Sequence, residues 1–236
     1  MQAQLFRCCA RLVRWLLEVD GSRGMSEAYD WSWLRNRMPV VDLPAYVAMP
    51  EDVARLIEVR DGMILHCESP SPNHVAICDN FKSALRDAVA KRAPGEPCLR
   101  ASGELDMLVS EVPFHFKRPD GIVYRCVEEP RGKWKTKPTA ADALLVIEVV
   151  SPGTVTADLV DKRALYARLG IPQYWIVRMT NDDGPARSIE MLRLTADGTY
   201  VTEHVGARAH GDRLAVKAAD PVEVSVSWDQ LDVGLD

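Results

Sequence analysis

The order of apolar and polar positions predicts a chain in which helices and strands alternate from residue 38 onward. Apolar residues recur every three or four positions over residues 74–92, which is typical of an amphipathic helix. The run ALLVIEVVS at 143–151 is apolar throughout, as in a strand covered on both faces of its sheet. The expected elements are, in chain order, a short helix over 50–57, two extended runs around the turn Asp61-Gly62, a helix over 74–92, strands near 105–117, 121–127 and 143–151, a helix over about 155–169, a strand over 173–177, and strands over 188–226 with a hairpin turn at Asp197-Gly198.

The first 24 residues differ from the rest of the chain. Arginines at positions 7, 11 and 14 share one helical face and interrupt the apolar residues around them, which is not the pattern of a secretory signal. Two interpretations stay open: a basic amphipathic surface helix, or a poorly ordered leader before a true start at Met25. We therefore expect residues 1–24 to be an N-terminal extension and residues 38–236 to form a single elaborated domain.

Composition and charge narrow the class of protein. The chain is 47% hydrophobic and 27% charged, as in an ordinary globular protein, and no apolar run reaches the roughly 18–20 residues of a membrane-spanning helix. The net charge of −5 argues against a surface covered in positive charge for non-specific nucleic-acid binding, although it leaves room for a local basic patch. None of the six cysteines forms a C-x-x-C pair, so we expect buried, reduced cysteines in a cytoplasmic protein.

Glu148 stands out because it interrupts the apolar run of residues 144–150. If both faces of the sheet are covered, an ionised carboxylate there loses its water at an uncompensated cost of several kcal/mol. It therefore needs a cation, a set of hydrogen-bond donors or a metal ion as partner. A structural ion pair, or a glutamate at the exposed end of the strand, is the alternative.

Lys162 and Asp120 point to the same place in the fold. Lys162 lies near the middle of the apolar stripe of the helix over 155–169, which directly follows the strand of Glu148; a lysine that reaches the rim of the helix is the alternative. Asp120 precedes the strand over 121–127 in RPDG, where a simple turn is the alternative. Two carboxylates from neighbouring strands suit magnesium, and a lysine beside them can orient an attacking water or stabilise charge on a phosphate.

Three residues are secondary candidates for this site. Glu58 lies in the extended run IEV, and three interpretations stay open: a further metal ligand, a second-layer residue that supports the metal ligands, or an exposed strand residue. His74 begins the 74–92 helix and points along its apolar stripe, where an ordinary core histidine is the alternative to a ligand. Asp158 lies one helical turn before Lys162 and can form an (i, i+4) ion pair that orients the lysine.

The best candidate for nucleic-acid contact is the segment 131–137. It places four cations, Arg131, Lys133, Lys135 and Lys137, around the single aromatic residue Trp134. The cations can contact phosphates and the indole ring can stack on a base. A solvated loop is the alternative, favoured by the acidic residues that precede the segment.

Three motifs occur in a fixed order: RPDG, then LLVIEVVSPGT, then D-x-x-x-K-R-A-L-Y-A-x-x-G-I-P-Q-Y-W-I-V, with IEVRDG and SPSPNH upstream. Together they resemble the Uma-type restriction endonuclease family of the PD-(D/E)XK nuclease superfamily, over about residues 40 to 230. The resemblance implies an α/β (α+β) fold of restriction-endonuclease type, in which helices flank a mixed central sheet. It also implies a metal-dependent phosphodiesterase site with Asp120 and Glu148 as metal ligands.

Two positions depart from the pattern of that superfamily. The usual lysine lies two residues after the glutamate, where this chain has Val150, so Lys162 would supply the role from the helix. Gly121 stands where an aliphatic residue is expected, which favours a late start of the strand after Asp120.

The expected function is that of an endonuclease that hydrolyses DNA phosphodiester bonds with Mg²⁺, for which Mn²⁺ would substitute. DNA is the expected partner, and assembly as a homodimer stays open. The alternative is a nucleic-acid-binding or protein-interaction module that retains the fold without catalysis, since the chain is acidic and lacks the usual lysine.

Overall fold

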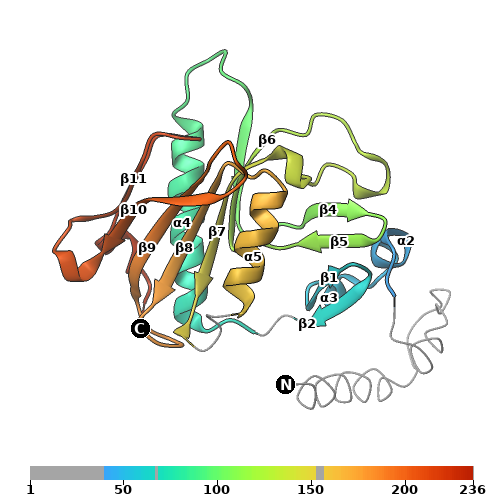
Figure 1. Ribbon diagram of the computed structural model, residues 1–236, viewed down its shortest axis with the longest axis horizontal. Coiled ribbons are helices and arrows are strands. Elements are labelled where there is room, and N and C mark those ends of the chain that lie inside the picture. The colour runs from blue at the N-terminus through green and yellow to red at the C-terminus, as the bar shows by residue number, and fades with distance from the viewer. Residues whose placement is uncertain (1–39, 67–68, 153–156, 236) are drawn as a thin grey trace. The chain divides into compact units, whose positions relative to one another are not determined.

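The computed structural model describes residues 40–66, 69–152 and 157–235 (Figure 1). The residues 1–24 expected as an extension lie outside these ranges. The described elements, with η for 3₁₀ turns, are α2 (Leu43–Val47), α3 (Glu51–Ala54), β1 (Ile57–Arg60), β2 (Met63–His66), α4 (Pro72–Ala90), β3 (Leu99–Ser102), β4 (Met107–Glu111), β5 (Phe114–Lys117), β6 (Gly121–Arg125), η2 (Gly132–Trp134), η3 (Ala140–Asp142), β7 (Ala143–Val150), α5 (Ala157–Arg168), β8 (Gln173–Met179), β9 (Ala186–Leu194), β10 (Tyr200–Ala207), η5 (Arg208–His210), β11 (Leu214–Ala218), β12 (Val224–Ser227) and α6 (Trp228–Leu231).

The larger sheet has the strand order β10-β9-β8-β7-β6-β3. Strands β7 and β8 are parallel, as their connection through the helix α5 requires, and the other neighbours are antiparallel. Figure 1 shows α4 on one face of this sheet and α5 on the other. Because helices cover both faces, β7 is apolar on both sides, as its sequence indicates.

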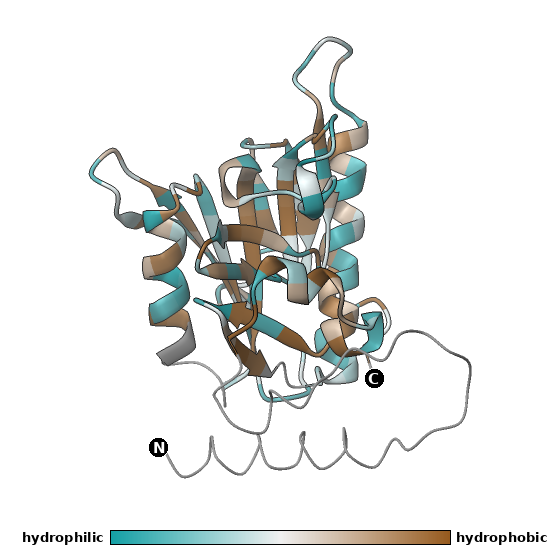
Figure 2. Ribbon diagram, turned by 90° about the vertical axis from the view of Figure 1, so that its right-hand side faces the viewer, coloured by the Kyte–Doolittle hydropathy of each residue, from teal (hydrophilic) through white to brown (hydrophobic). Residues whose placement is uncertain are grey.

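Two hydrophobic clusters lie on the two faces of the larger sheet. On the α4 side, Phe81 and Leu85 pack with Ile147 of β7. On the α5 side, Leu159 and Tyr166 pack with other residues of the same sheet. Figure 2 shows the strands between the two long helices mainly in hydrophobic colours, while both helices also carry hydrophilic residues. The expectation of a mixed central sheet flanked by helices is therefore confirmed.

A smaller sheet has the order β2-β1-β5-β4. Its hairpin β1–β2 turns at Asp61-Gly62, both with positive φ, which confirms the turn indicated by the sequence. The expected helix over 50–57 is shorter, since β1 already begins at Ile57. The strand expected over 105–117 is instead the hairpin β4–β5, because Pro113 breaks the run and cannot extend a ladder.

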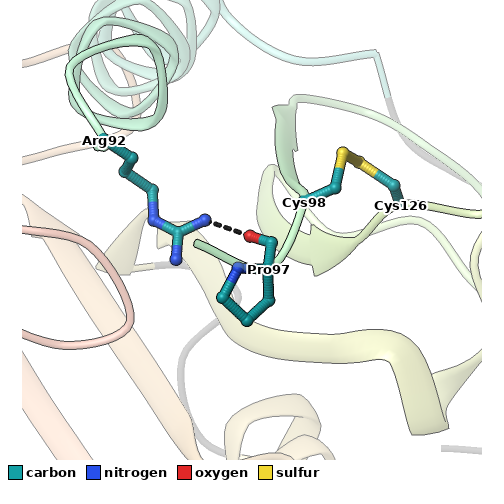
Figure 3. Close-up of a disulfide and its surroundings, with 4 residues drawn as sticks. All are labelled: Arg92, Pro97, Cys98 and Cys126. Atoms are coloured by element: carbon teal, nitrogen blue, oxygen red, sulfur yellow. Dashed lines mark hydrogen bonds between the residues drawn. A yellow bond between two sulfur atoms is a disulfide. The ribbon is translucent and has the colours of Figure 1, made fainter. Parts of the chain in front are cut away.

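The expectation of reduced cysteines is wrong for Cys98 and Cys126. These residues form a disulfide that joins the segment before β3 to the end of β6 (Figure 3). The register of the two antiparallel strands places the cysteines opposite each other, with Cα atoms 5.4 Å apart, a spacing that a disulfide bridges without backbone movement. Arg92 donates a hydrogen bond to the Pro97 carbonyl beside the bridge. Cysteine usage therefore no longer argues for a reducing compartment.

Within the described residues, no helix is long and apolar enough to cross a membrane.

Candidate active site

Glu148 lies in the middle of the larger sheet, where β7 is covered by α5. Only 4% of the residue is exposed, and each carboxylate oxygen accepts a hydrogen bond from that helix. Lys162 Nζ donates to Oε2 at 2.8 Å and the Tyr166 hydroxyl donates to Oε1 at 2.6 Å. Helix α5 places both donors on one face, because they are four residues apart. The burial that the sequence indicates for Glu148 therefore comes with two partners.

The charges around Glu148 oppose one another. Burial raises the pKa of the Glu148 carboxyl, the ammonium group of Lys162 lowers it, and the negative charge of Asp120 raises it again; the net effect is an increase above the ordinary value. Burial also raises the pKa of Tyr166, which keeps this hydroxyl protonated as a donor. Burial is therefore the main reason that the pKa of Glu148 lies above its ordinary value.

Asp120 reaches the same region from the neighbouring strand. The antiparallel register pairs Gly121 with Ile147, so Asp120 stands opposite Glu148. Its Oδ2 accepts a hydrogen bond from the Val149 N–H at 2.7 Å, which fixes the carboxylate at the start of β6. The expected late start of this strand is wrong: β6 begins at Gly121, and a Cβ there would lie 3.2 Å from the Ile147 Cβ, so a larger residue has little room.

His74 approaches Asp120 from helix α4. The helix begins after Ser71, whose hydroxyl accepts a hydrogen bond from the His74 N–H, so the histidine lies in the first turn. Its Nε2 is 3.4 Å from Asp120 Oδ1. Burial lowers the pKa of His74, but Asp120, Glu148 and the nearby Glu104 together raise it above the ordinary value. The imidazole therefore faces acidic groups, although the sequence leaves an ordinary core position as its alternative.

The other two secondary candidates, Glu58 and Asp158, have no described contact with Asp120 or Glu148. Both carboxylate oxygens of Glu58 accept hydrogen bonds from the smaller sheet and its end: Lys117 Nζ donates to Oε2 at 2.7 Å, and the Arg118 N–H donates to Oε1 at 2.7 Å. Its charge nevertheless reaches Tyr166, where it helps to raise the pKa of the hydroxyl. The side chain of Asp158 lies outside the described part of the structure.

The expectation that Trp134 stacks on a base is wrong. The residue is only 2% exposed, because its ring packs among Tyr46, Phe114 and Phe116, at centroid distances of 6.1 to 6.3 Å. Its Nε1–H donates to the Pro138 carbonyl at 3.0 Å. An amphipathic ring beside a loop can serve the core as well as a ligand, and local sequence does not distinguish the two.

The four cations around Trp134 fall into two pairs. Arg131 donates to both carboxylate oxygens of Asp142, and Lys137 pairs with Asp106. Lys133 and Lys135 are exposed. Arg131 and Lys137 keep about two fifths of their side chains exposed despite these ion pairs.

The structure arranges these residues in two groups: His74 and Cys78 of α4 lie beside Asp120, and Lys162 and Tyr166 of α5 donate hydrogen bonds to Glu148. The negative charge of Asp120 raises the pKa of Glu148, which links the two groups. Sequence reasoning missed Tyr166 and Cys78, which lie on the apolar stripes of their helices. The i, i+4 spacing of each from a candidate, Tyr166 from Lys162 and Cys78 from His74, is the signal that could have found them. The donor set offers oxygen ligands for a metal ion beside an ammonium group.

Comparisons with known proteins bear on the family and the fold of this chain. The family model Uma2, described as "Putative restriction endonuclease", matches residues 43–229. Among solved structures, the chain is similar to the crystal structure of a putative nuclease belonging to DUF820 from Anabaena variabilis ATCC 29413, with a TM-score of 0.56 and 18% sequence identity, over 83% of this chain and 99% of that one. At this identity the similarity shows the fold, and it confirms the expected fold class. None of the curated proteins is similar enough to this chain to count as a match.

Proposed function

Because the chain belongs to the Uma2 restriction endonuclease family, we propose that it hydrolyses DNA phosphodiester bonds with a divalent metal ion held by Asp120 and Glu148. The observation that carries the proposal is the position of these two carboxylates. They stand opposite each other on neighbouring strands, with Lys162 and Tyr166 hydrogen-bonded to the buried one. A charged group so deeply buried among aliphatic residues has a cost that a purely structural position could avoid.

The two carboxylates fit a magnesium ion by their chemistry. Mg²⁺ takes oxygen ligands and is commonly held by one or two carboxylates together with water and phosphate oxygens, and we expect Mn²⁺ to replace it. When bound, such an ion polarises a phosphate oxygen and lowers the pKa of water. The ordered Asp120 Oδ2, held by the Val149 N–H, orients one carboxylate, and the Tyr166 hydroxyl orients the other.

Lys162 acts where negative charge develops. Its ammonium group is close to Glu148 and 16% of its side chain is exposed, so it can turn from the carboxylate toward an attacking water or the scissile phosphate. A preorganised cation in a region of low dielectric constant stabilises the added charge of the transition state more than water does. Lys162 therefore takes the role that the lysine two residues after the glutamate has in the superfamily.

In this proposal, the cations of the segment 131–137 contact the phosphates of the DNA backbone. The exposed Lys133 and Lys135 are the primary phosphate contacts, and the exposed parts of Arg131 and Lys137 extend the same surface. Such contacts position the DNA without reading its sequence. Trp134 is left out because the aromatic cluster covers it.

The test is cleavage of supercoiled plasmid DNA in the presence of Mg²⁺ or Mn²⁺. We expect nicking by the wild type, its loss in the presence of a chelator, and its loss in Asp120→Asn. The matched control is Asp229→Asn, which removes a carboxylate from an exposed position on α6 and should cleave at the wild-type rate. A folded wild type that binds metal but never cuts DNA would favour the interaction module instead.

A further inference from the structure

A cluster of three potential metal ligands lies on the α4 side of the candidate active site. His74 and Cys78 are four residues apart on α4, and Asp120 faces them from the start of β6. One ligand atom of each, the imidazole nitrogen, the thiol sulfur and a carboxylate oxygen, lies within 4.8 Å of the other two. Residues at i and i+4 share a helix face, which is also the spacing of the two histidines in zinc-binding H-E-x-x-H helices.

The atoms of this cluster differ in kind from those of the magnesium site. Asp120 and Glu148 offer only oxygen, whereas the cluster combines nitrogen, sulfur and oxygen. Zn²⁺ is bound by thiolate at about 2.3 Å and by imidazole at about 2.0–2.1 Å, and Mg²⁺ prefers oxygen ligands. Small side-chain rotations would bring three atoms that already lie within 4.8 Å to these bond lengths. The donor set therefore suits a soft cation.

Carboxylates outside the cluster add negative charge to it. Glu104 and Glu148 act on both His74 and Cys78, in addition to Asp120. The backbone of Glu104 is held beside Asp120, because its N–H donates to the Pro119 carbonyl at 3.1 Å. A cation entering the cluster would gain from the negative field of these carboxylates. Lys82, one turn after Cys78 on α4, is paired with Asp79.

Cys78 adds selectivity between metal ions. It is buried, with 8% exposed, and its sulfur is the one soft ligand atom of the cluster. Binding of a metal ion by cysteine releases the thiol proton, which requires an ion with high affinity for sulfur. Mg²⁺ lacks this affinity, so it leaves the cluster untouched while Zn²⁺ can occupy it.

We propose that His74, Cys78 and Asp120 form a second cation site, selective for soft divalent ions such as Zn²⁺, whose occupancy withdraws Asp120 from the magnesium site and inhibits cleavage. Asp120 is shared, since its Oδ1 faces His74 while its backbone position lies opposite Glu148. His74 and Asp120 have side chains about one fifth exposed, so an ion can enter from solvent. When Asp120 binds Zn²⁺ through the oxygen that faces His74, the Zn²⁺ neutralises the charge of the carboxylate, which weakens Mg²⁺ binding beside Glu148. The inhibition rests on the proposed nuclease function, and the binding does not.

The binding test uses Co²⁺ as a spectroscopic substitute for Zn²⁺. The full-length protein titrated with Co²⁺ should develop a thiolate-to-metal charge-transfer band, and Zn²⁺ should abolish the band by displacement. Cys78→Ser should lose the band and bind Zn²⁺ at least about 10-fold more weakly. The control Cys8→Ser/Cys9→Ser removes two other thiols and should retain the band.

The activity test adds Zn²⁺ to plasmid cleavage at constant Mg²⁺. Zn²⁺ should inhibit the wild type, and Cys78→Ser should cleave with Mg²⁺ but resist the inhibition. If the serine variant does not fold, Cys78→Ala provides the same test with an apolar residue in the core.

The outcomes separate the two proposals. No charge-transfer band in the wild type, or an unchanged band in Cys78→Ser, would overturn the second site. A band without inhibition, in a protein that cuts DNA, would overturn the sharing of Asp120. A protein that never cuts DNA would overturn the proposed function, while the Co²⁺ titration would still decide whether the cation site exists.

Discussion

Two lysine–glutamate pairs lie inside this protein at nearly the same distance, in different surroundings. Lys162 donates to Glu148 at 2.8 Å in the larger sheet, and Lys117 donates to Glu58 at 2.7 Å in the smaller one. Lys117 is the more deeply buried of the two lysines, with 2% of its side chain exposed against 16% for Lys162. Distance and partner type therefore do not distinguish the pairs.

The charges near each carboxylate do distinguish them. Glu58 takes its second hydrogen bond from the Arg118 backbone, so one cation balances one anion. Glu148 has the second carboxylate Asp120 close by, whose charge raises the pKa of Glu148. The pair of Glu58 joins strands of the smaller sheet, whereas we propose that Glu148 and Asp120 together carry negative charge that a metal ion balances. The second carboxylate is what distinguishes the proposed site from a structural ion pair.

The largest expected effect separates the two glutamates. Glu148→Gln should lower the rate of Mg²⁺-dependent plasmid nicking by about 10²- to 10³-fold, the scale of losing a preorganised charge at a reaction centre, and should weaken Mg²⁺ binding. Glu58→Gln should leave the apparent Mg²⁺ affinity near that of the wild type. The measurement is the nicking rate as a function of Mg²⁺ concentration. Equal losses of affinity would place Glu58 among the ligands and remove the contrast.

Replacing the two lysines should have contrasting effects: loss of Lys117 should mainly lower stability, and loss of Lys162 should mainly lower activity. Lys117→Met should lower the free energy of unfolding by about 3–5 kcal/mol, because it leaves Glu58 buried without a cation. Lys162→Met should cost less stability, since its site is partly open to water, yet it should slow cleavage about 10²-fold. Urea unfolding and plasmid nicking of the same protein batch measure both quantities. Full activity in Lys162→Met would show that this lysine is only a counter-ion.

A smaller effect is expected at the hydroxyl that holds Glu148. Tyr166→Phe removes one donor to the carboxylate and should cost about 1.5–3 kcal/mol of stability, with a loss of cleavage rate below that of Lys162→Met. The control is Tyr200→Phe, whose buried hydroxyl donates to the neutral Ile171 carbonyl at 2.7 Å and has no contact with Glu148. If both variants cleave DNA at the wild-type rate, Tyr166 has no part in positioning the carboxylate.

The smallest effect should come from cations outside both pairs. Lys133→Ala/Lys135→Ala should reduce the slope of DNA affinity against salt concentration, on logarithmic axes, by about two units, since each lost phosphate contact contributes about 0.9. Lys91→Ala/Lys217→Ala removes the same charge from exposed positions elsewhere and should leave the slope unchanged. Binding measured by fluorescence anisotropy at several salt concentrations gives both slopes. An equal decrease in both variants would indicate a general charge effect rather than contacts by this segment.

Local sequence was sufficient for the elements that build the site. The apolar run around Glu148 predicts β7, and the stripe that contains Lys162 predicts α5, because burial on both faces and helical periodicity are visible over a few residues. The same patterns identify Glu148 and Lys162 as polar exceptions, which the structure joins by a hydrogen bond. The turn at Asp61-Gly62 was equally visible, since it depends on residues that tolerate positive φ.

Contacts between distant segments were beyond the reach of such patterns. The disulfide depends on the register of β3 against β6. The burial of Trp134 depends on aromatic residues of α2 and β5. The position of Cys78 beside Asp120 depends on the packing of α4 against the sheet. The sequence by itself determined β7, α5 and the turn at Asp61-Gly62, and which polar residues are out of place, because these follow from local periodicity and turn chemistry. Only the tertiary structure decided which of those residues meet, because strand register and helix packing depend on the whole core.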